Sequence, residues 1–154
     1  MTRSEIIAEL KKYFDIRELV CPHTYKAFGD KAWQFLDTEI LETILIVRRD
    51  IIKKPMTCND YHIGGGITQR GLRCNICKLV QDKSVKNQIY LSAHCNGAGF
   101  DFVVTGMSSD AVRKSIEANS NLLPHQVRME NAVSWLHIDC YDNGSGKKVS
   151  YFNG

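Results

Sequence analysis

Apolar residues recur at helical spacing in two stretches of the N-terminal half of the chain. Residues 2–14 begin with Thr2 and Glu5 in the capping-box pattern, and their apolar positions fall on one helical face: Ile6, Ile7, Leu10 and Phe14. Residues 37–52 carry a broader apolar stripe that includes Ile40, Leu41, Ile44, Leu45 and Val47. Both stretches predict helices that pack on a core.

The second half of the chain changes to short apolar runs separated by turn residues. The stretch GFDFVV, residues 99–104, predicts a buried strand, and residues 108–119 predict a third helix capped by Ser108. Three further strands are predicted in HQVRME, VSWLHIDCY and KKVSYFNG, and a short one in KPMTCND. The glycine-rich IGGGITQRGLRCN predicts a loop over a site. Helices followed by a small, mostly antiparallel sheet define an α+β fold.

Length and composition favour a single domain, residues 1–154, with an ordinary core. The net charge is only +3, from 20 basic and 17 acidic residues without a basic block, which argues against a nucleic-acid partner. Because no signal peptide and no membrane span is visible, we expect a cytoplasmic protein without membrane contact. A monomer is expected, although the sequence itself leaves the oligomeric state open. In that compartment the six cysteines are expected to be free thiols or metal ligands.

Potential metal ligands stand in two motifs. In SAHCNGAGFDF, His94 and Asp101 flank small residues, and Gly97 and Gly99 would let the chain turn so that both side chains converge. In SWLHID, the strand period puts His137 and Asp139 on one face. Two histidines and a carboxylate form a ligand set typical of catalytic zinc, with Asp139 supporting the nearby histidine.

These motifs resemble those of a known family. SAHCNGAGFD is similar to the S-x-H-x-x-G-x-A-x-D motif of the zinc D,D-peptidases, which include D-Ala-D-Ala carboxypeptidases and phage L-alanyl-D-glutamate endolysins and share their fold with the Hedgehog signalling domain. SWLHID resembles the family's second metal motif. FDIRELVCPHTYKAFG and KPMTCNDYHIGGGITQRGLR look like upstream segments of its phage-type subgroup, so the resemblance covers residues 14–139.

The resemblance implies a Hedgehog/DD-peptidase fold and a zinc metallopeptidase that hydrolyses peptidoglycan stem or cross-link peptides. The zinc ligands would be His94, Asp101 and His137, with Ser92 as a supporting residue. An endolysin without a signal peptide would reach the cell wall through lysis or a holin. Which peptide bond is cut, and whether a host or a phage encodes the chain, stays open.

The general base departs from the family pattern. Ser134 occupies the position where the D-Ala-D-Ala dipeptidases, a further branch of this family, carry glutamate, three residues before the last zinc histidine. Glu130, seven residues before His137, is our candidate. A single regular strand would put residues seven apart on opposite faces, so a turn or bulge at Asn131 is required, and a solvent-facing Glu130 is the alternative.

Other residues are candidates for substrate contact. Arg70 or Arg73 could pair with a substrate carboxylate, and either could instead be a surface arginine. His62 lies in the glycine-rich loop, and Trp135 could form a wall of the site.

The C-x-x-C pair Cys74 and Cys77 could join Cys21 and His23 in a structural zinc site, with free thiols as the default. Two rival functions remain. If Ser134 reflects a lost general base, the protein is a catalytically inactive, zinc-bearing module that binds the cell wall. If the metal lies at the Cys/His site instead, it is an interaction protein stabilised by that site.

Overall fold

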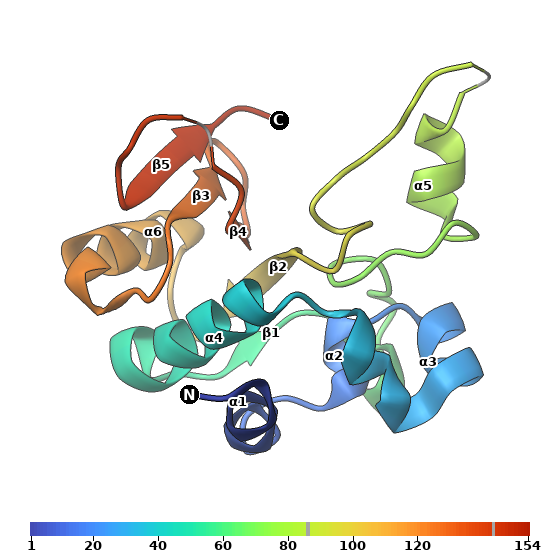
Figure 1. The fold of residues 1–154 in the computed structure, drawn as a ribbon, viewed down its shortest axis with the longest axis horizontal. Coiled ribbons are helices and arrows are strands. Elements are labelled where there is room, and N and C mark those ends of the chain that lie inside the picture. Colours follow the sequence, from blue (N-terminus) through green and yellow to red (C-terminus); the bar gives the residue numbers. More distant parts are fainter. Residues whose placement is uncertain (86, 143) are drawn as a thin grey trace.

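The N-terminal half of the chain forms most of the helical layer. The computed structural model describes residues 1–85, 87–142 and 144–154 (Figure 1). The helices of this half are α1 (Arg3–Leu10), α2 (Ile16–Leu19), α3 (Pro22–Phe28), the 3-10 helix η1 (Gly29–Phe35), α4 (Thr38–Ile46) and the π-helical turn η2 (Val47–Ile52). Thr2 caps α1 in a capping box, as the sequence predicts. The predicted helix over 37–52 is α4 continued by η2, and it ends at Lys53, which has a left-handed conformation.

A five-stranded sheet lies against these helices. Its strands, in the spatial order β1-β2-β4-β3-β5, are β1 (Met56–Thr57), β2 (Gly99–Val104), β4 (Leu136–Asp139), β3 (Val127–Glu130) and β5 (Val149–Phe152). All neighbouring pairs are antiparallel except β3 and β5. The remaining helices are η3 (Tyr61–Ile63), α5 (Lys78–Lys83), α6 (Ser109–Ala118) and η4 (Ser120–Leu122). The expected mixed architecture, with a small and mostly antiparallel sheet covered by helices, is confirmed.

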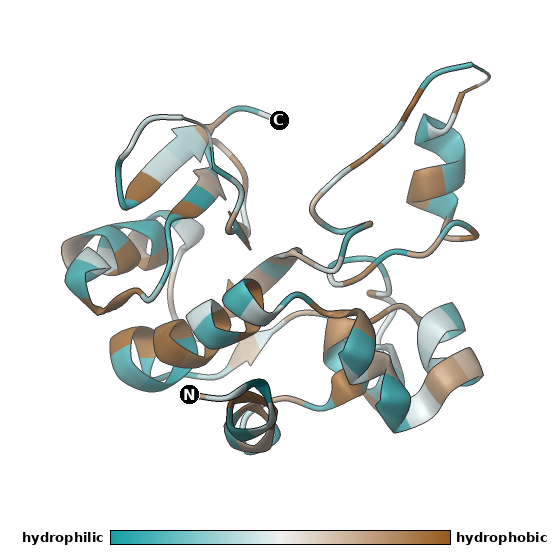
Figure 2. Ribbon diagram, in the orientation of Figure 1, coloured by the Kyte–Doolittle hydropathy of each residue, from teal (hydrophilic) through white to brown (hydrophobic). Residues whose placement is uncertain are grey.

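The core fills the space between the helices and one face of the sheet. Phe100 and Phe102 of β2 are completely or almost completely buried, and the Phe102 ring contacts Phe14 at a centroid distance of 5.7 Å. In β4, Leu136 and Ile138 belong to the same core cluster. Figure 2 shows the hydropathy along these elements, including the apolar residues of α4 and β2. Burial of these large side chains is the main source of stability.

The other face of the sheet carries polar side chains in register. Asp101 of β2 is paired with His137 of β4, and Asp139 of β4 is paired with Arg128 of β3. Because side chains alternate along a strand, His137 and Asp139 point away from the core that Leu136 and Ile138 enter. The sheet thereby gathers charged and metal-binding side chains on one side. None of the described helices has the length and apolar character needed to cross a membrane.

Candidate metal centre and cleft

His94, Asp101 and His137 converge at the polar face of the sheet. Asp101 and His137 lie on adjacent strands, and His94 lies in the turn before β2. One carboxylate oxygen of Asp101 is 2.8 Å from His137 Nδ1, and the other is 3.3 Å from His94 Nε2. One ligand atom from each residue can be chosen so that all lie within 4.8 Å of one another. Tetrahedral zinc with bonds of about 2.0–2.1 Å separates its donors by roughly 3.3 Å, so these residues can hold a metal.

The hydrogen bonds of His94 leave one nitrogen free for a cation. His94 Nδ1 is 3.0 Å from the carbonyl oxygen of Gly71. A carbonyl only accepts, so Nδ1 carries the hydrogen and the Nε2 lone pair of a neutral ring faces Asp101. A lone pair facing a carboxylate oxygen is unfavourable unless a proton or a metal ion lies between them. The donor chemistry of this site therefore fits a bound cation.

His137 is held between two carboxylates. Its Nε2 atom lies 3.0 Å from Asp139, whose two oxygens also accept hydrogen bonds of 2.9 Å from Arg128. Asp139 is 1% exposed and receives the backbone N–H of Tyr141 as well, so its charge is compensated on several sides. With the Nε2 hydrogen donated to Asp139, Nδ1 is directed toward Asp101. Asp139 thus has the orienting position that the strand period predicted.

The ionisation of these groups reflects their mutual contacts. Burial opposes the charged form of Asp101, but hydrogen bonds from His137 and His94 outweigh it and hold its pKa well below the usual range. Burial by itself would lower the pKa of His137. The hydrogen bonds to Asp101 and Asp139 together have the larger effect and raise this pKa to about 9. Because a histidine binds a metal ion only after losing its proton, an ion at this group would compete with protons for His137.

Two glycines allow the chain to pass from His94 to Asp101. Gly97 has a φ of +65°, and a Cβ there would collide with the backbone oxygen of Phe35. At Gly99 the φ is ordinary, but a Cβ would lie only 2.7 Å from the Cβ of Ala93. The turn and the close packing thus both require glycine, which explains why Gly99 stands where the similar motif has alanine.

A cavity of about 560 Å³ opens over the three residues. One side comes from α5 and the segment that follows it, including Lys83 and Leu91, and the other comes from the strands β3 and β5 (Figure 1). The polar and charged residues that line it are Arg73, Lys83, Ser92, His94, Asp101, Arg128, Glu130, His137, Asp139 and Tyr141. A cleft with mixed charge above a metal-binding group has the form of a site for a polar ligand.

Glu130 lines this cleft. It ends β3, Ala132 has a φ of +58°, and β4 begins at Leu136, so a turn separates Glu130 from His137. Since Arg128 is paired with Asp139, continuation of the same register brings Glu130 opposite His137. The strand-parity objection therefore does not apply, because the two residues lie on different strands. Ser134 is exposed in the turn.

Two of the candidates for substrate contact line the cleft, and a third lines a neighbouring cavity. Trp135 lines the cleft, and its Nε1 atom is buried with no hydrogen-bond partner among the described residues. Arg73 also lines the cleft, and its guanidinium lies 3.5 Å from Asp101. Arg70 lines an adjoining cavity of about 310 Å³ that shares Arg73, Asp101 and Trp135 with the cleft.

His62 and Ser92 have other surroundings. His62 lies in η3 beside Tyr61 and outside the set of described residues that line the cleft. Ser92 lines the cleft, but its hydroxyl is hydrogen-bonded with Cys95 at 3.3 Å rather than with a ligand residue.

Two arginines that we did not single out in the sequence contribute to the site. Arg128 holds Asp139 and stacks against the rings of Tyr141 and Phe152. Arg113 of α6 is 5% exposed and donates to the carbonyl oxygens of Glu130, Val133 and Trp135. Alternation in VRME places Arg128 and Glu130 on one face, so the first of them could have been found from the sequence. Arg113 leaves no comparable local pattern.

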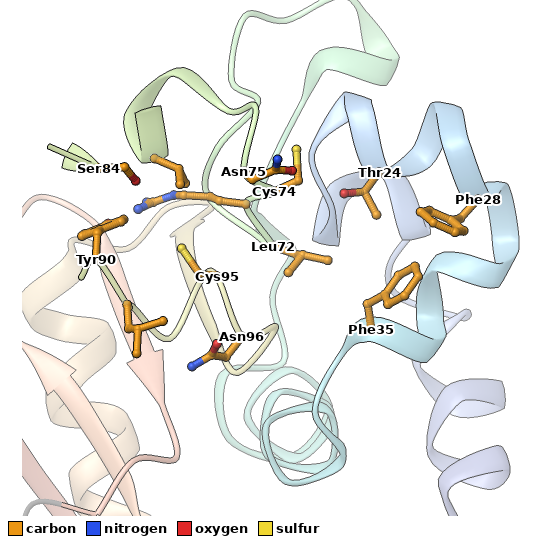
Figure 3. A pocket seen from close by; sticks show the side chains of 13 residues that line it. Thr24, Phe28, Phe35, Leu72, Cys74, Asn75, Ser84, Tyr90, Cys95 and Asn96 are labelled. Atoms are coloured by element: carbon orange, nitrogen blue, oxygen red, sulfur yellow. The ribbon is translucent and has the colours of Figure 1, made fainter. Parts of the chain in front are cut away.

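A second group of metal-binding side chains lies at the base of α5. It consists of Cys21, His23, Cys74 and Cys77, whose ligand atoms lie within 4.8 Å of one another. A cavity of about 620 Å³ adjoins it, with Thr24, Phe28, Phe35, Leu72, Cys74 and Tyr90 among its walls (Figure 3). Arg73 lines both this cavity and the cleft, and it directly precedes Cys74 in the chain.

Comparisons with known proteins add no relative. No family model matches the chain, and no curated protein or solved structure matches it either.

Proposed function

We propose that this protein is a zinc-dependent peptidase of the Hedgehog/DD-peptidase type that hydrolyses peptidoglycan peptides. The observation that carries the proposal is the convergence of His94, Asp101 and His137, taken from two separate motifs, at the floor of an open cleft. The ligand set of two histidines and one carboxylate is typical of catalytic zinc, and it leaves a position for water or substrate. The resemblance of the two motifs to those of the zinc D,D-peptidases supplies the substrate class.

The residues of the chain have distinct roles in this proposal. Zinc supplies Lewis acidity toward the scissile carbonyl and lowers the pKa of a water molecule. Glu130 accepts the proton of the attacking water and delivers it to the leaving amine. Gly71 and Asp139 orient the two histidine rings through their outer nitrogens. Hydrolysis then consumes one water and releases a carboxylate and an amine.

Charges around the cleft suit a peptide that carries carboxylates. Arg73, Lys83 and Arg128 line it from different elements. Arg128 and Arg73 already contact carboxylates of the protein, whereas the contact found for Lys83 among the described residues is with the ring of Tyr90. Arg70 lines the adjoining cavity, and we assign to it the pairing with a substrate carboxylate.

Mass spectrometry of muropeptides tests the proposal. Purified sacculi and muropeptides are incubated with zinc-loaded protein, with and without a chelator. We expect new fragments that disappear with the chelator and whose masses identify the bond that is cut. Glu130→Gln should retain zinc and lower the rate by about 10²- to 10⁴-fold. Glu39→Gln, at an exposed site in the first turn of α4, is the matched control and should keep full activity.

An inactive protein that still carries zinc would contradict the peptidase proposal. It would favour the rival function, a module that binds peptidoglycan without cutting it, which sedimentation with sacculi would reveal. Equal rates for Glu130→Gln and the unchanged protein would remove Glu130 from the mechanism while leaving the zinc site in place.

A further inference from the structure

The Cys/His group has the dimensions of a tetrahedral metal site. Cys74 Sγ lies 3.7 Å from Cys77 Sγ and 3.5 Å from His23 Nδ1, and Cys77 Sγ lies 3.7 Å from the same nitrogen. With Zn–S bonds of about 2.3 Å and Zn–N bonds of about 2.1 Å, a tetrahedron separates two sulfurs by about 3.8 Å and a sulfur from a nitrogen by about 3.6 Å. The observed separations agree with a shared central ion.

A disulfide does not explain this arrangement. Its two sulfurs would be about 2.05 Å apart, far closer than those of Cys74 and Cys77. Cys21 is completely buried in the same cluster. Three sulfurs and one imidazole nitrogen around one point form the ligand set of structural zinc sites, in which all four positions belong to the protein.

The backbone brings the two halves of the group together. Val20 and Leu72 form a parallel bridge, and the N–H of Cys21 donates to the carbonyl of Leu72 at 3.0 Å. A turn closed by the N–H of Cys77 and the carbonyl of Cys74 then directs both thiols inward. α5 begins immediately after Cys77. An ion here would connect α3, the segment 71–74 and α5, a region with only a small apolar cluster of its own.

The same segment supports the candidate catalytic ligands. The carbonyl of Gly71 accepts from His94 Nδ1, and the N–H of Arg73 donates to the carbonyl of His94 at 3.1 Å. The Arg73 side chain reaches Asp101, and Cys74 is the next residue. A displacement of Cys74 would therefore also displace Gly71 and Arg73, whose hydrogen bonds position His94 and Asp101.

We propose that Cys21, His23, Cys74 and Cys77 bind a structural zinc ion, and that this ion positions Gly71 and Arg73 against His94 and Asp101. The ion needs no open coordination position and takes no part in chemistry. Zinc binding at the Cys/His group does not depend on the peptidase proposal, whereas its influence on the metal affinity of His94, Asp101 and His137 rests on metal binding at that group.

Metal analysis of variants of the full chain tests the binding. The unchanged protein is expected to carry two zinc equivalents, and Cys77→Ser and His94→Ala are each expected to lose one. After cobalt substitution, thiolate-to-cobalt charge-transfer absorption should be present in His94→Ala and absent in Cys77→Ser. Cys140→Ser, which alters a thiol that contacts Thr43, is the control and should keep both zinc ions and the absorption.

A measurement on the unchanged protein guards against a variant that does not fold. We expect three thiols to react with a thiol reagent only after zinc is removed by a chelator. Unchanged thiol reactivity on chelation, or absence of thiolate absorption in the cobalt protein, would overturn the site.

The positioning role has its own readout. In Cys77→Ser, zinc affinity at His94, Asp101 and His137 should fall by about 10- to 100-fold, the usual effect of losing support for metal ligands. An affinity equal to that of Cys140→Ser would overturn this role. Failure of the peptidase proposal would look different, because thiolate-bound zinc would persist while muropeptides stayed uncut.

Discussion

The two histidines of the candidate centre are oriented by partners of different charge. His94 donates to the neutral carbonyl of Gly71, while His137 donates to the carboxylate of Asp139. A carboxylate partner makes an imidazole a stronger ligand, and Arg128 fixes that carboxylate with two hydrogen bonds. We therefore expect the metal affinity of this centre to depend more on Asp139, through His137, than on Gly71.

Replacing Asp139 by asparagine tests this difference. Asp139→Asn keeps the size of the side chain but removes its charge, and it leaves the partly buried Arg128 guanidinium with a weaker partner. We expect zinc affinity at this centre to fall by about 10- to 100-fold, measured by competition with a chromophoric chelator. Asp82→Asn, at an exposed carboxylate of α5 paired with Lys78, should leave the affinity unchanged. Equal affinities for both variants would rule out an orienting role for Asp139.

Sequence motifs predict single residues well where spacing carries the chemistry. His94, Asp101 and His137 were predicted as a group from two motifs, and the structure brings them together. Arg113 could not be predicted, because its partners are backbone carbonyls of a turn that is distant in sequence. The placement of His62 away from the cleft could not be predicted either, since nothing in a glycine-rich loop indicates its course.

At the scale of elements, the turn between β3 and β4 presents both Glu130 and Trp135 to the cleft. It is held from below by Arg113 of α6, whose guanidinium binds carbonyls on both sides of the turn. Ser109 of the same helix also donates to Val133 at 2.9 Å. Helix α6 thus determines where the candidate base stands, although it contributes no side chain to the cleft.

Truncating this arginine should therefore affect stability and catalysis together. Arg113→Met removes the side-chain donor to the carbonyls of Glu130 and Trp135, while the carbonyl of Val133 keeps its hydrogen bond from Ser109. Because each carbonyl that loses its donor costs about 1–3 kcal/mol, we expect the free energy of unfolding to fall by about 2–4 kcal/mol. Urea denaturation measures this change. Under conditions where the variant is folded, kcat for muropeptide hydrolysis should also fall while zinc content is retained. Lys114→Met, at the exposed neighbouring position, should alter neither quantity. A loss of stability with unchanged kcat would contradict the positioning role.

The long elements are predicted from periodicity, and the short strands β1, β3, β4 and β5 from apolar runs bounded by turn residues, whereas the short helices are not predicted. The structure confirms the strand over 99–104 and the helices near 2–14, 37–52 and 108–119. These elements could be predicted because each repeats its apolar pattern several times. Helices α2, α3 and α5 are too short for a period to be recognised. Their local signals were present, however, since Asp15 and Glu18 form a capping box and Pro22 occupies the first turn of α3.

For the whole molecule, the cleft arises from segments far apart in the sequence. Residues of α5 face residues of β3 and β5, and the order β1-β2-β4-β3-β5 that creates this geometry has no local signature. The polar face of the sheet buries charged residues that are compensated mainly by one another. An ion that binds this site only in the folded state therefore stabilises the folded protein.

Metal removal should therefore lower the stability of the entire domain. At a free zinc concentration 100-fold above the dissociation constant, each occupied site adds about 2.7 kcal/mol. We expect the Tm of the chelated protein to rise on addition of zinc, as measured by scanning calorimetry. In His94→Ala the rise should be smaller but still present, through the Cys/His site. If zinc did not raise Tm in either protein, selective binding to the folded state would be refuted.

The position of Gly154 has a practical consequence for work on this protein. This residue lines the cleft, and a side chain at that position would collide with the carboxylate of Glu130. The amino group of Met1, by contrast, lies near Glu42 of α4 (Figure 1). Anything joined after Gly154, such as an affinity tag, would start at the rim of the cleft beside the candidate base. Fusions placed before Met1 leave that rim open to large substrates such as intact sacculi.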